Sequence, residues 1–590
     1  MRKSVKALFS VGLFCLASAA IVAGESPSTG YELSVYAGTP VLFWGFTSVS
    51  MALGIVGGLY LCTYYQRLAA AGLALTVVML IATLPYIRQY YFYGQADSLQ
   101  HLGWAIDMLS TSNPLERNPY PSLHLISLAL SSVLEIPLRR AFLLSMPVTY
   151  LLFAVSTPLI ARSFIDDNGG HSTTIGLLFS TLSTPIIVVR LPNFQPIATV
   201  AGLFILLFVV YLLFRTTQSS GLERRFSSVL LIALIGLVFF HPQQALVAVA
   251  LSLIFIATSN ISGFSRYRHI STLSAVTAAS IVLGYWLVTR RVLVGAAAAL
   301  ISGLNAARGG ISSATPGAGF QDIGGNLVTL FARTLGVQIA ISIIVVGITT
   351  VSVWRLAQYY SRPNVEFPTR ESMQLRYIVG FVPLIALAVV NLGSGNLPQV
   401  VRYAAALVAL GTPLVVAHFA ILRSRYDNQS VVATLTVVLL IGAAVSVPVM
   451  FRSPYVYQPA PHVTETQLDG YEWTFKNRDN QSVASVNTDV SRQLIALRGF
   501  EEGNRAWGEG SLRPLAPDRR GIGFVPAHFN DRNLRDLSTR PYLLASTEYG
   551  YQRNVGLYDG LRFNELDYQY IETETNRIYS NGEFNLYRIS

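Results

Sequence analysis

Three ionisable residues, Asp97, His101 and Asp107, lie close together in the aromatic-rich stretch 90–122, which directly follows an apolar segment. The pattern predicts a helix over 96–109, in which His101 is one turn beyond Asp97 on the same face. Such a carboxylate and imidazole could act as a general base and its orienting partner, or hold a divalent metal such as Mg²⁺ or Mn²⁺. The alternative is a solvated interfacial helix whose polar face carries these residues without chemistry.

A second group of candidates lies in the motif NPYPSLH at 118–124. Two prolines bracket Tyr120, so the chain is extended or turning there. Tyr120 and His124 could therefore line a pocket beside the predicted helix. A tyrosine at a bilayer interface can equally be an anchor for the headgroup region.

His241 and Arg402 are two further candidates, each placed where an apolar segment begins or ends. His241 precedes Pro242 in an HPQQ turn, and a histidine at membrane depth indicates function unless it only caps a helix. Arg402 begins an apolar span, where its planar donors could clamp a phosphate. It could also extend its charge to the lipid headgroups, although arginine is disfavoured on the outer side of a membrane.

The composition shows which elements must position these residues. The chain has 590 residues, of which 52% are hydrophobic and only 12% are charged, whereas soluble domains carry about 25% charged residues. Residues 1–451 contain 13 acidic and 26 basic residues, and residues 452–590 contain 18 acidic and 16 basic residues. We therefore predict a polytopic α-helical membrane domain over 1–451 with about 13 spans, followed by a soluble α+β domain over 452–590.

The distribution of charge predicts how the chain crosses the membrane. Much of the net charge of +11 sits in short connectors, such as Arg224 with Arg225 and Arg423 with Arg425. Clusters of this kind mark the cytoplasmic side of a membrane protein, so nucleic-acid binding is not indicated. The N-terminus is then cytoplasmic, and the loop 88–122 and the C-terminal domain are extracytoplasmic. The stretch 1–24 is either a cleaved signal peptide or a retained helix, and its long apolar run favours the helix.

Several common catalytic signatures are absent from the sequence. There is no Walker A motif, GxSxG elbow, HExxH motif or Cys/His cluster, and the two cysteines, Cys15 and Cys62, lie in or beside apolar spans. The connectors on the inner side are too short for a nucleotide-binding domain. An enzyme built this way would take its activated substrate from the membrane.

Short motifs along most of the chain resemble those of the GT-C superfamily of membrane glycosyltransferases, in particular archaeal multi-spanning proteins of that type. They are YELSVYAGTPVLFW (31–44), YGQADSLQHLGWA (93–105), NPYPSLH (118–124), FFHPQQAL (239–246), VVRYAAALVALGTP (400–413) and NRIYSNGEFNLYRI (576–589). The resemblance implies a polyprenyl (dolichyl) phosphate-linked sugar as donor. The acceptor would be a glycan, lipid or protein on the extracytoplasmic face.

The resemblance also implies roles for individual residues. Asp97 would activate the acceptor as a general base or as a metal-bound carboxylate. Arg402 with Tyr403 would hold the donor phosphate. The remaining pocket residues would be His101, Tyr120, His124 and His241.

The sequence departs from the superfamily pattern in two places. The loop has no DxD pair, and the C-terminal domain has no WWDYG-like motif. These departures argue against an oligosaccharyltransferase and leave metal dependence open. Two other functions stay open: a transporter or flippase of a lipid-linked glycan, and a non-catalytic protein of envelope assembly. Asn480-Gln481-Ser482 is an N-glycosylation sequon in the external domain.

Overall fold

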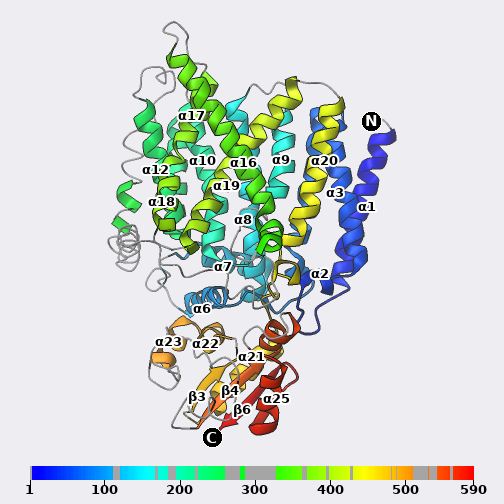
Figure 1. The fold of residues 1–590 in the computed structure, drawn as a ribbon, viewed down its shortest axis with the longest axis vertical. Helices are drawn as coiled ribbons and strands as arrows, with labels where there is room; N and C mark the ends of the chain where they lie inside the picture. Colours follow the sequence, from blue (N-terminus) through cyan, green and yellow to red (C-terminus); the bar gives the residue numbers. More distant parts are fainter. Residues whose placement is uncertain are drawn as a thin grey trace.

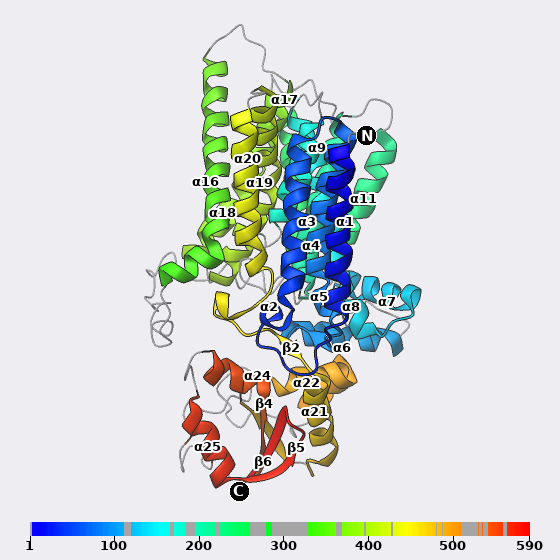
Figure 2. The same ribbon diagram turned by 90° about the vertical axis from the view of Figure 1, so that its right-hand side faces the viewer.

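A computed structural model gives the fold of the chain. It describes residues 3–110, 118, 120–165, 170–183, 195–218, 223–259, 279–282, 284–285, 327–361, 369–393, 397–425, 429–479, 481–486, 488–508, 529, 534, 541–557 and 563–590. A long helical bundle stands above a smaller domain that contains a sheet (Figure 1). The N-terminus and the C-terminal domain lie at opposite ends of the bundle (Figures 1 and 2). The end that carries the domain is called the domain end below.

Long apolar helices make up the bundle. In chain order they are α1 (Lys3–Gly24), α3 (Val41–Tyr60), α4 (Tyr64–Ala82), α8 (Leu138–Ala161), α9 (His171–Ser183), α10 (Ala198–Gln218), α11 (Glu223–Phe240), α12 (Pro242–Ser259), α16 (Leu327–Tyr360), α17 (Thr369–Val379), α18 (Val382–Gly393), α19 (Leu397–Arg425) and α20 (Gln429–Ser446). Helices suit this environment because they satisfy their own backbone hydrogen bonds in lipid.

Eight helical stretches among the described residues are long and apolar enough to cross a membrane. The chain is thus a multi-pass membrane protein, as its composition predicts. The first of these stretches, Lys3–Gly24, packs in the bundle, where the Ser50 hydroxyl of α3 donates to the Gly12 carbonyl at 3.0 Å. The predicted count of about 13 spans is not tested, because predicted spans such as 173–189 and 273–288 lie partly outside the described residues.

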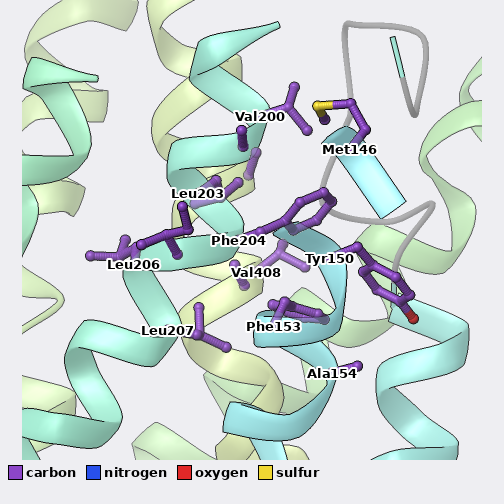
Figure 3. Close-up of a cluster of buried hydrophobic side chains, with 14 of the residues drawn as sticks. Met146, Tyr150, Phe153, Ala154, Val200, Leu203, Phe204, Leu206, Leu207 and Val408 are labelled. Carbon is purple, nitrogen blue, oxygen red and sulfur yellow. The ribbon is translucent and has the colours of Figure 1, made fainter. Parts of the chain in front are cut away.

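Aromatic and aliphatic side chains fill the centre of the bundle (Figure 3). Phe153 of α8 and Phe204 of α10 lie with their ring centroids 5.8 Å apart, and Val408 of α19 joins the same cluster. Tyr150 is buried beside them, and its hydroxyl donates to the Ser180 carbonyl of α9 at 2.9 Å. The core therefore packs α8 against three neighbouring helices, α9, α10 and α19.

Two helices at the domain end are not candidate spans. They are α6 (Asp97–Ser110) and α7 (Ser122–Leu134), and Figure 2 shows both at the domain end of the bundle. α6 matches the helix predicted over 96–109. α7 is too short to cross a bilayer, and it ends at Glu135, whose φ of 53° is left-handed. α7 is therefore not counted among the spans.

The C-terminal domain is α+β, as predicted. Its four-stranded sheet has the order β3-β4-β6-β5, formed by β3 (Ser482–Ser485), β4 (Tyr542–Thr547), β6 (Phe584–Ile589) and β5 (Asn576–Ser580). β3 pairs parallel to β4, and the other neighbours are antiparallel. Its helices are α21 (Glu465–Asn477), α22 (Val490–Arg498), α23 (Phe500–Gly508), α24 (Glu548–Tyr551) and α25 (Glu565–Glu574).

Three segments distant in sequence form a junction between the bundle and this domain. β1 (Phe92–Tyr93) pairs antiparallel with β2 (His462–Val463). The Ala460 N–H donates to the Leu33 carbonyl at 2.9 Å, and the Ser28 N–H donates to the Arg88 carbonyl at 2.8 Å. We call the segments 25–40, 88–96 and 452–464 together the junction. It fixes the start of α6, because α6 follows β1 directly.

Candidate functional site

α6 is held between the bundle and the domain. Gly94 and Ala96 have positive φ values of 156° and 52°, and they turn the chain from β1 into the helix. On the far side, Gly103 lies against α22: a Cβ atom built at Gly103 would be 2.6 Å from the Ile495 carbonyl oxygen. The absence of a side chain at Gly103 therefore allows the two helices to approach closely.

Asp97 is the first residue of α6, and its side chain is 67% exposed. A carboxylate at a helix N-terminus interacts favourably with the helix dipole. Its Oδ1 lies 3.6 Å from Nη2 of Arg492 on α22, and the Nε of Arg492 lies 3.6 Å from Asp489. Because the Asp97–Arg492 pair is exposed and long, it holds the carboxylate weakly. Asp97 is thus accessible at the domain end.

His101 is buried one turn further along α6 and faces other partners than Asp97. Its Nδ1 is 3.1 Å from Nε2 of the buried His124 of α7. The Nδ2 atom of Asn118 is 2.9 Å from Nδ1 of His124. Burial, and then the electrostatic effects of His241 and Arg492, lower the pKa of His101 to about 3. His101 is therefore a neutral imidazole at physiological pH.

Aromatic rings connect this histidine pair to the turn between α11 and α12. Trp104 lies 5.2 Å from the His101 ring and 6.0 Å from Tyr120, measured between ring centroids. The ring of Tyr120 lies 5.8 Å from that of His241. The sequence candidates His101, Tyr120, His124 and His241 are therefore brought together in one cluster.

Arg402 and Tyr403 lie in the second turn of α19, at the domain end. Both are half-buried, and Arg402 is close enough to His241 to act on it electrostatically. The order of contacts thus runs from His101 through Tyr120 and His241 toward Arg402. Asp97 lies one helical turn before His101, on the exposed start of α6.

Asp107 connects α6 with the C-terminal domain. Its Oδ2 accepts the backbone N–H of Glu501 at 3.0 Å, at the start of α23. A carboxylate in this position caps the helix and satisfies one of its unpaired N–H groups. Asp107 therefore anchors the domain to α6.

The structure does not bring Asp97 and His101 into a common metal site. Asp97 is exposed toward Arg492, whereas His101 is buried against His124. Among the residues that the structure describes, no group of three or more His, Cys, Asp or Glu side chains is arranged to hold a metal. The two side chains on this helix thus differ in exposure and partners. A metal held by Asp97 and His101 stays a prediction.

Three residues of this region were not among the sequence candidates: Asn118, Trp104 and Arg492. Asn118 and Trp104 lie inside motifs already noted in the sequence. Their closeness in sequence to His124 and His101 could have identified them as candidates. Arg492 comes from the soluble domain, and no local pattern connects it with Asp97.

Neither a protein-family model nor a curated protein sequence matches this chain. ArnT from Cupriavidus metallidurans bound to undecaprenyl phosphate is a similar solved structure, with 10% identity, coverage of 87% of this chain and 97% of that chain, and a TM-score of 0.43. The archaeal oligosaccharyltransferase AglB from Archaeoglobus fulgidus, in complex with an inhibitory peptide and a dolichol-phosphate, is 11% identical, with coverage of 81% and 69% and a TM-score of 0.49.

A further structure of the Archaeoglobus fulgidus oligosaccharyltransferase, in complex with Zn and sulfate, is 11% identical, with coverage of 87% and 72% and a TM-score of 0.46. At these identities and TM-scores, no residue of this chain is matched to one of theirs.

Proposed function

We propose that this chain is a membrane glycosyltransferase of the GT-C type. It transfers a sugar from a polyprenyl (dolichyl) phosphate donor to a glycan, lipid or protein acceptor on the extracytoplasmic face. The main support is the exposed carboxylate of Asp97, which lies beside the soluble domain on the helix whose His101 is connected through Tyr120 and His241 with Arg402. Glycosyl transfer needs a base for the acceptor hydroxyl and a cation for the departing phosphate.

The proposed roles follow from the positions of the residues. Asp97 is the general base, because its carboxylate is accessible and is oriented by Arg492 at 3.6 Å. Arg402 holds the donor phosphate together with Tyr403, since both lie near the start of α19 beside His241. His101, Tyr120, His124 and His241 form the wall between these two groups.

The role of Asp97 is tested with the Asp97→Asn variant in proteoliposomes that contain a radiolabelled polyprenyl-phosphate sugar. Loss of a general base is expected to lower the rate of transfer by about 10²–10⁴-fold. Asp469→Asn, which changes an exposed acid of α21 away from this cluster, is the matched control and should keep the wild-type rate. A wild-type rate in Asp97→Asn would remove Asp97 from the mechanism.

The role of Arg402 is tested by donor binding. Arg402→Ala should weaken binding of undecaprenyl phosphate at least tenfold, because a charged hydrogen-bond donor to the phosphate is lost. Arg588→Ala, an exposed arginine of β6, is the control for the loss of one positive charge. Equal donor affinity in the two variants would place the phosphate elsewhere.

The same proteoliposomes separate this proposal from transport. Purified protein that exchanges a lipid-linked glycan across the vesicle membrane, without forming any glycosylated product, would favour the flippase. Protein that does neither would favour a non-catalytic function in envelope assembly.

A further inference from the structure

Asn118, His124 and His101 form a chain of buried polar side chains beside the proposed base. They are 2%, 0% and 6% exposed. The contacts are 2.9 Å between Asn118 Nδ2 and His124 Nδ1, and 3.1 Å between His124 Nε2 and His101 Nδ1. A buried hydrogen bond of this kind must have one donor and one acceptor, so the protons of the chain are arranged in a definite order.

The backbone fixes the orientation of the first member. The Tyr120 N–H donates to Asn118 Oδ1 at 3.0 Å. The amide oxygen is thus turned toward Tyr120, and the amide nitrogen, which can only donate, faces His124. Asn118 Nδ2 is also 3.4 Å from His124 Nε2, but the shorter contact identifies Nδ1 as the acceptor.

The order of protons follows from this orientation. A neutral imidazole that accepts at Nδ1 carries its proton on Nε2, so His124 donates from Nε2 to His101 Nδ1. His101 then accepts at Nδ1 and carries its own proton on Nε2. Burial lowers the pKa of His101 to about 3, which keeps the ring neutral and preserves this order near pH 7.

The Nε2 atom of His101 is the last atom in this series of hydrogen-bonded side chains. It has no hydrogen-bond partner among the described residues, and it is not one of the fully buried polar atoms that lack a partner. The described part of the protein therefore supplies no acceptor at this end, and a bound ligand could. An N–H group there can donate to an oxygen, but it has no lone pair with which to accept a proton.

We propose that Asn118 and His124 are positioning residues that hold His101 as the Nε2–H tautomer, so that His101 donates a neutral hydrogen bond to a phosphate oxygen of a bound polyprenyl phosphate. The choice of phosphate as acceptor rests on the proposed function, whereas the tautomer does not. His101 in this state cannot be a base, so proton abstraction is left to Asp97. The two residues that share a helix therefore have separate tasks.

The tautomer is measured directly by ¹⁵N NMR of the full-length protein in nanodiscs, with ¹⁵N label in its eight histidines. The His101→Gln variant identifies the His101 signals by their loss. The expected result at pH 7–8 is a bare Nδ1 and a protonated Nε2 in the wild-type ring. The opposite tautomer, or a charged ring, overturns the proposal.

The Asn118→Asp variant should reverse the donors and acceptors in these hydrogen bonds, with almost no change in side-chain size. A carboxylate only accepts, so His124 would carry its proton on Nδ1, accept at Nε2, and leave His101 protonated on Nδ1. Binding of undecaprenyl phosphate should then weaken about tenfold, because the donor at His101 Nε2 is gone. Asn477→Asp on α21, where the asparagine bonds only within its own helix, should change neither the NMR signals nor binding.

The NMR measurement and the binding measurement test different parts of the proposal. If His101 keeps its Nε2 proton in Asn118→Asp, the positioning role of Asn118 and His124 is wrong. If the ring inverts but undecaprenyl phosphate binds as tightly as before, the donor role of His101 is wrong. Absence of sugar transfer in the wild-type protein contradicts the proposed function and leaves the tautomer result standing.

Discussion

Glu32 and Arg88 form a buried ion pair within the junction. The guanidinium of Arg88 is 3% exposed and contacts both carboxylate oxygens of Glu32 at 2.6 Å, and Tyr90 also donates to this carboxylate. We predict that Glu32→Leu destabilises the protein by about 3–5 kcal/mol, because it leaves a buried charge without its partner. The double variant Glu32→Leu/Arg88→Met should recover most of this loss in thermal unfolding. A double variant as unstable as the sum of the single changes would contradict the prediction.

His462 makes the same junction sensitive to acid. Burial, and then the charge of Arg88, lower its pKa to about 3, compared with about 6.5 in an unfolded chain. The folded state thus binds fewer protons, so stability is complete above pH ~6.5 and declines as the pH falls toward ~3. His462→Asn should reduce the slope of stability against pH between 6.5 and 4, measured by thermal unfolding in detergent. An unchanged slope would place the acid sensitivity at other groups.

The sequence contained part of this residue-level picture. The spacing of Asp97 and His101 correctly indicated one helix. The motifs at 118–124 and 239–246 contain Tyr120, His124 and His241, which lie in one cluster with His101. Spacing could not show that burial separates Asp97 from His101, because burial depends on what α22 and α7 place on the helix. Arg492 could not be found from sequence, since its contact with Asp97 depends on the folding of a separate domain.

At the scale of elements, the close approach of α6 and α22 depends on Gly103. Alanine usually favours a helix over glycine by about 1 kcal/mol, but here its methyl group would meet the Ile495 carbonyl oxygen at 2.6 Å. We expect Gly103→Ala to destabilise the protein by about 1–3 kcal/mol, because α22 must move away. Gly72→Ala on α4, where a methyl group meets no atom within 4 Å, is the control and should cost nothing. Equal melting temperatures for both variants would show that the contact is not tight.

Apolar runs predicted most of the helices, because a lipid-exposed segment must satisfy its backbone internally and therefore shows a long apolar stretch. The same signal does not exist for β1 and β2, which are two residues long and pair across a sequence separation of several hundred residues. Their pairing places α6, so the sequence predicted the helix without predicting what positions it.

At the scale of the whole molecule, the topology predicted from charge puts the loop 88–122, Arg402 and the C-terminal domain on one side. α6 and the C-terminal domain lie at the domain end of the bundle, opposite the N-terminus (Figure 1). Arg402 acts on His241, and the aromatic contacts of His241 and Tyr120 connect it with His101 of α6. The sequence did not predict whether the domain touches the loop. Gly103, Asp107 and the β1–β2 pair show that it does, and that α6 is shared between the two parts.

Glu583, in the turn before β6, connects the C-terminal domain to the segment between α1 and α3. Its Oε1 accepts the Tyr31 N–H at 2.6 Å, its Oε2 accepts the Thr464 hydroxyl, and Gly30 lies against the same carboxylate. We predict that Glu583→Ala destabilises the protein by about 1.5–3 kcal/mol, the usual value of hydrogen bonds to a charged group. Because the lost contacts connect separate segments, hydrogen exchange should also accelerate within residues 25–40.

Glu574→Ala is the matched control for this prediction, since Glu574 is an exposed glutamate at the end of α25 in the same domain. It should leave both the melting temperature and the exchange of residues 25–40 unchanged. Glu583→Gln should fall between the two, because the amide keeps one acceptor oxygen for Tyr31 and loses the charge. Exchange in residues 25–40 that is equal in all three variants would mean that β1–β2 pairing and the Glu32–Arg88 pair hold the junction without Glu583. The domain would then be attached to the bundle through α6 and the 452–464 segment.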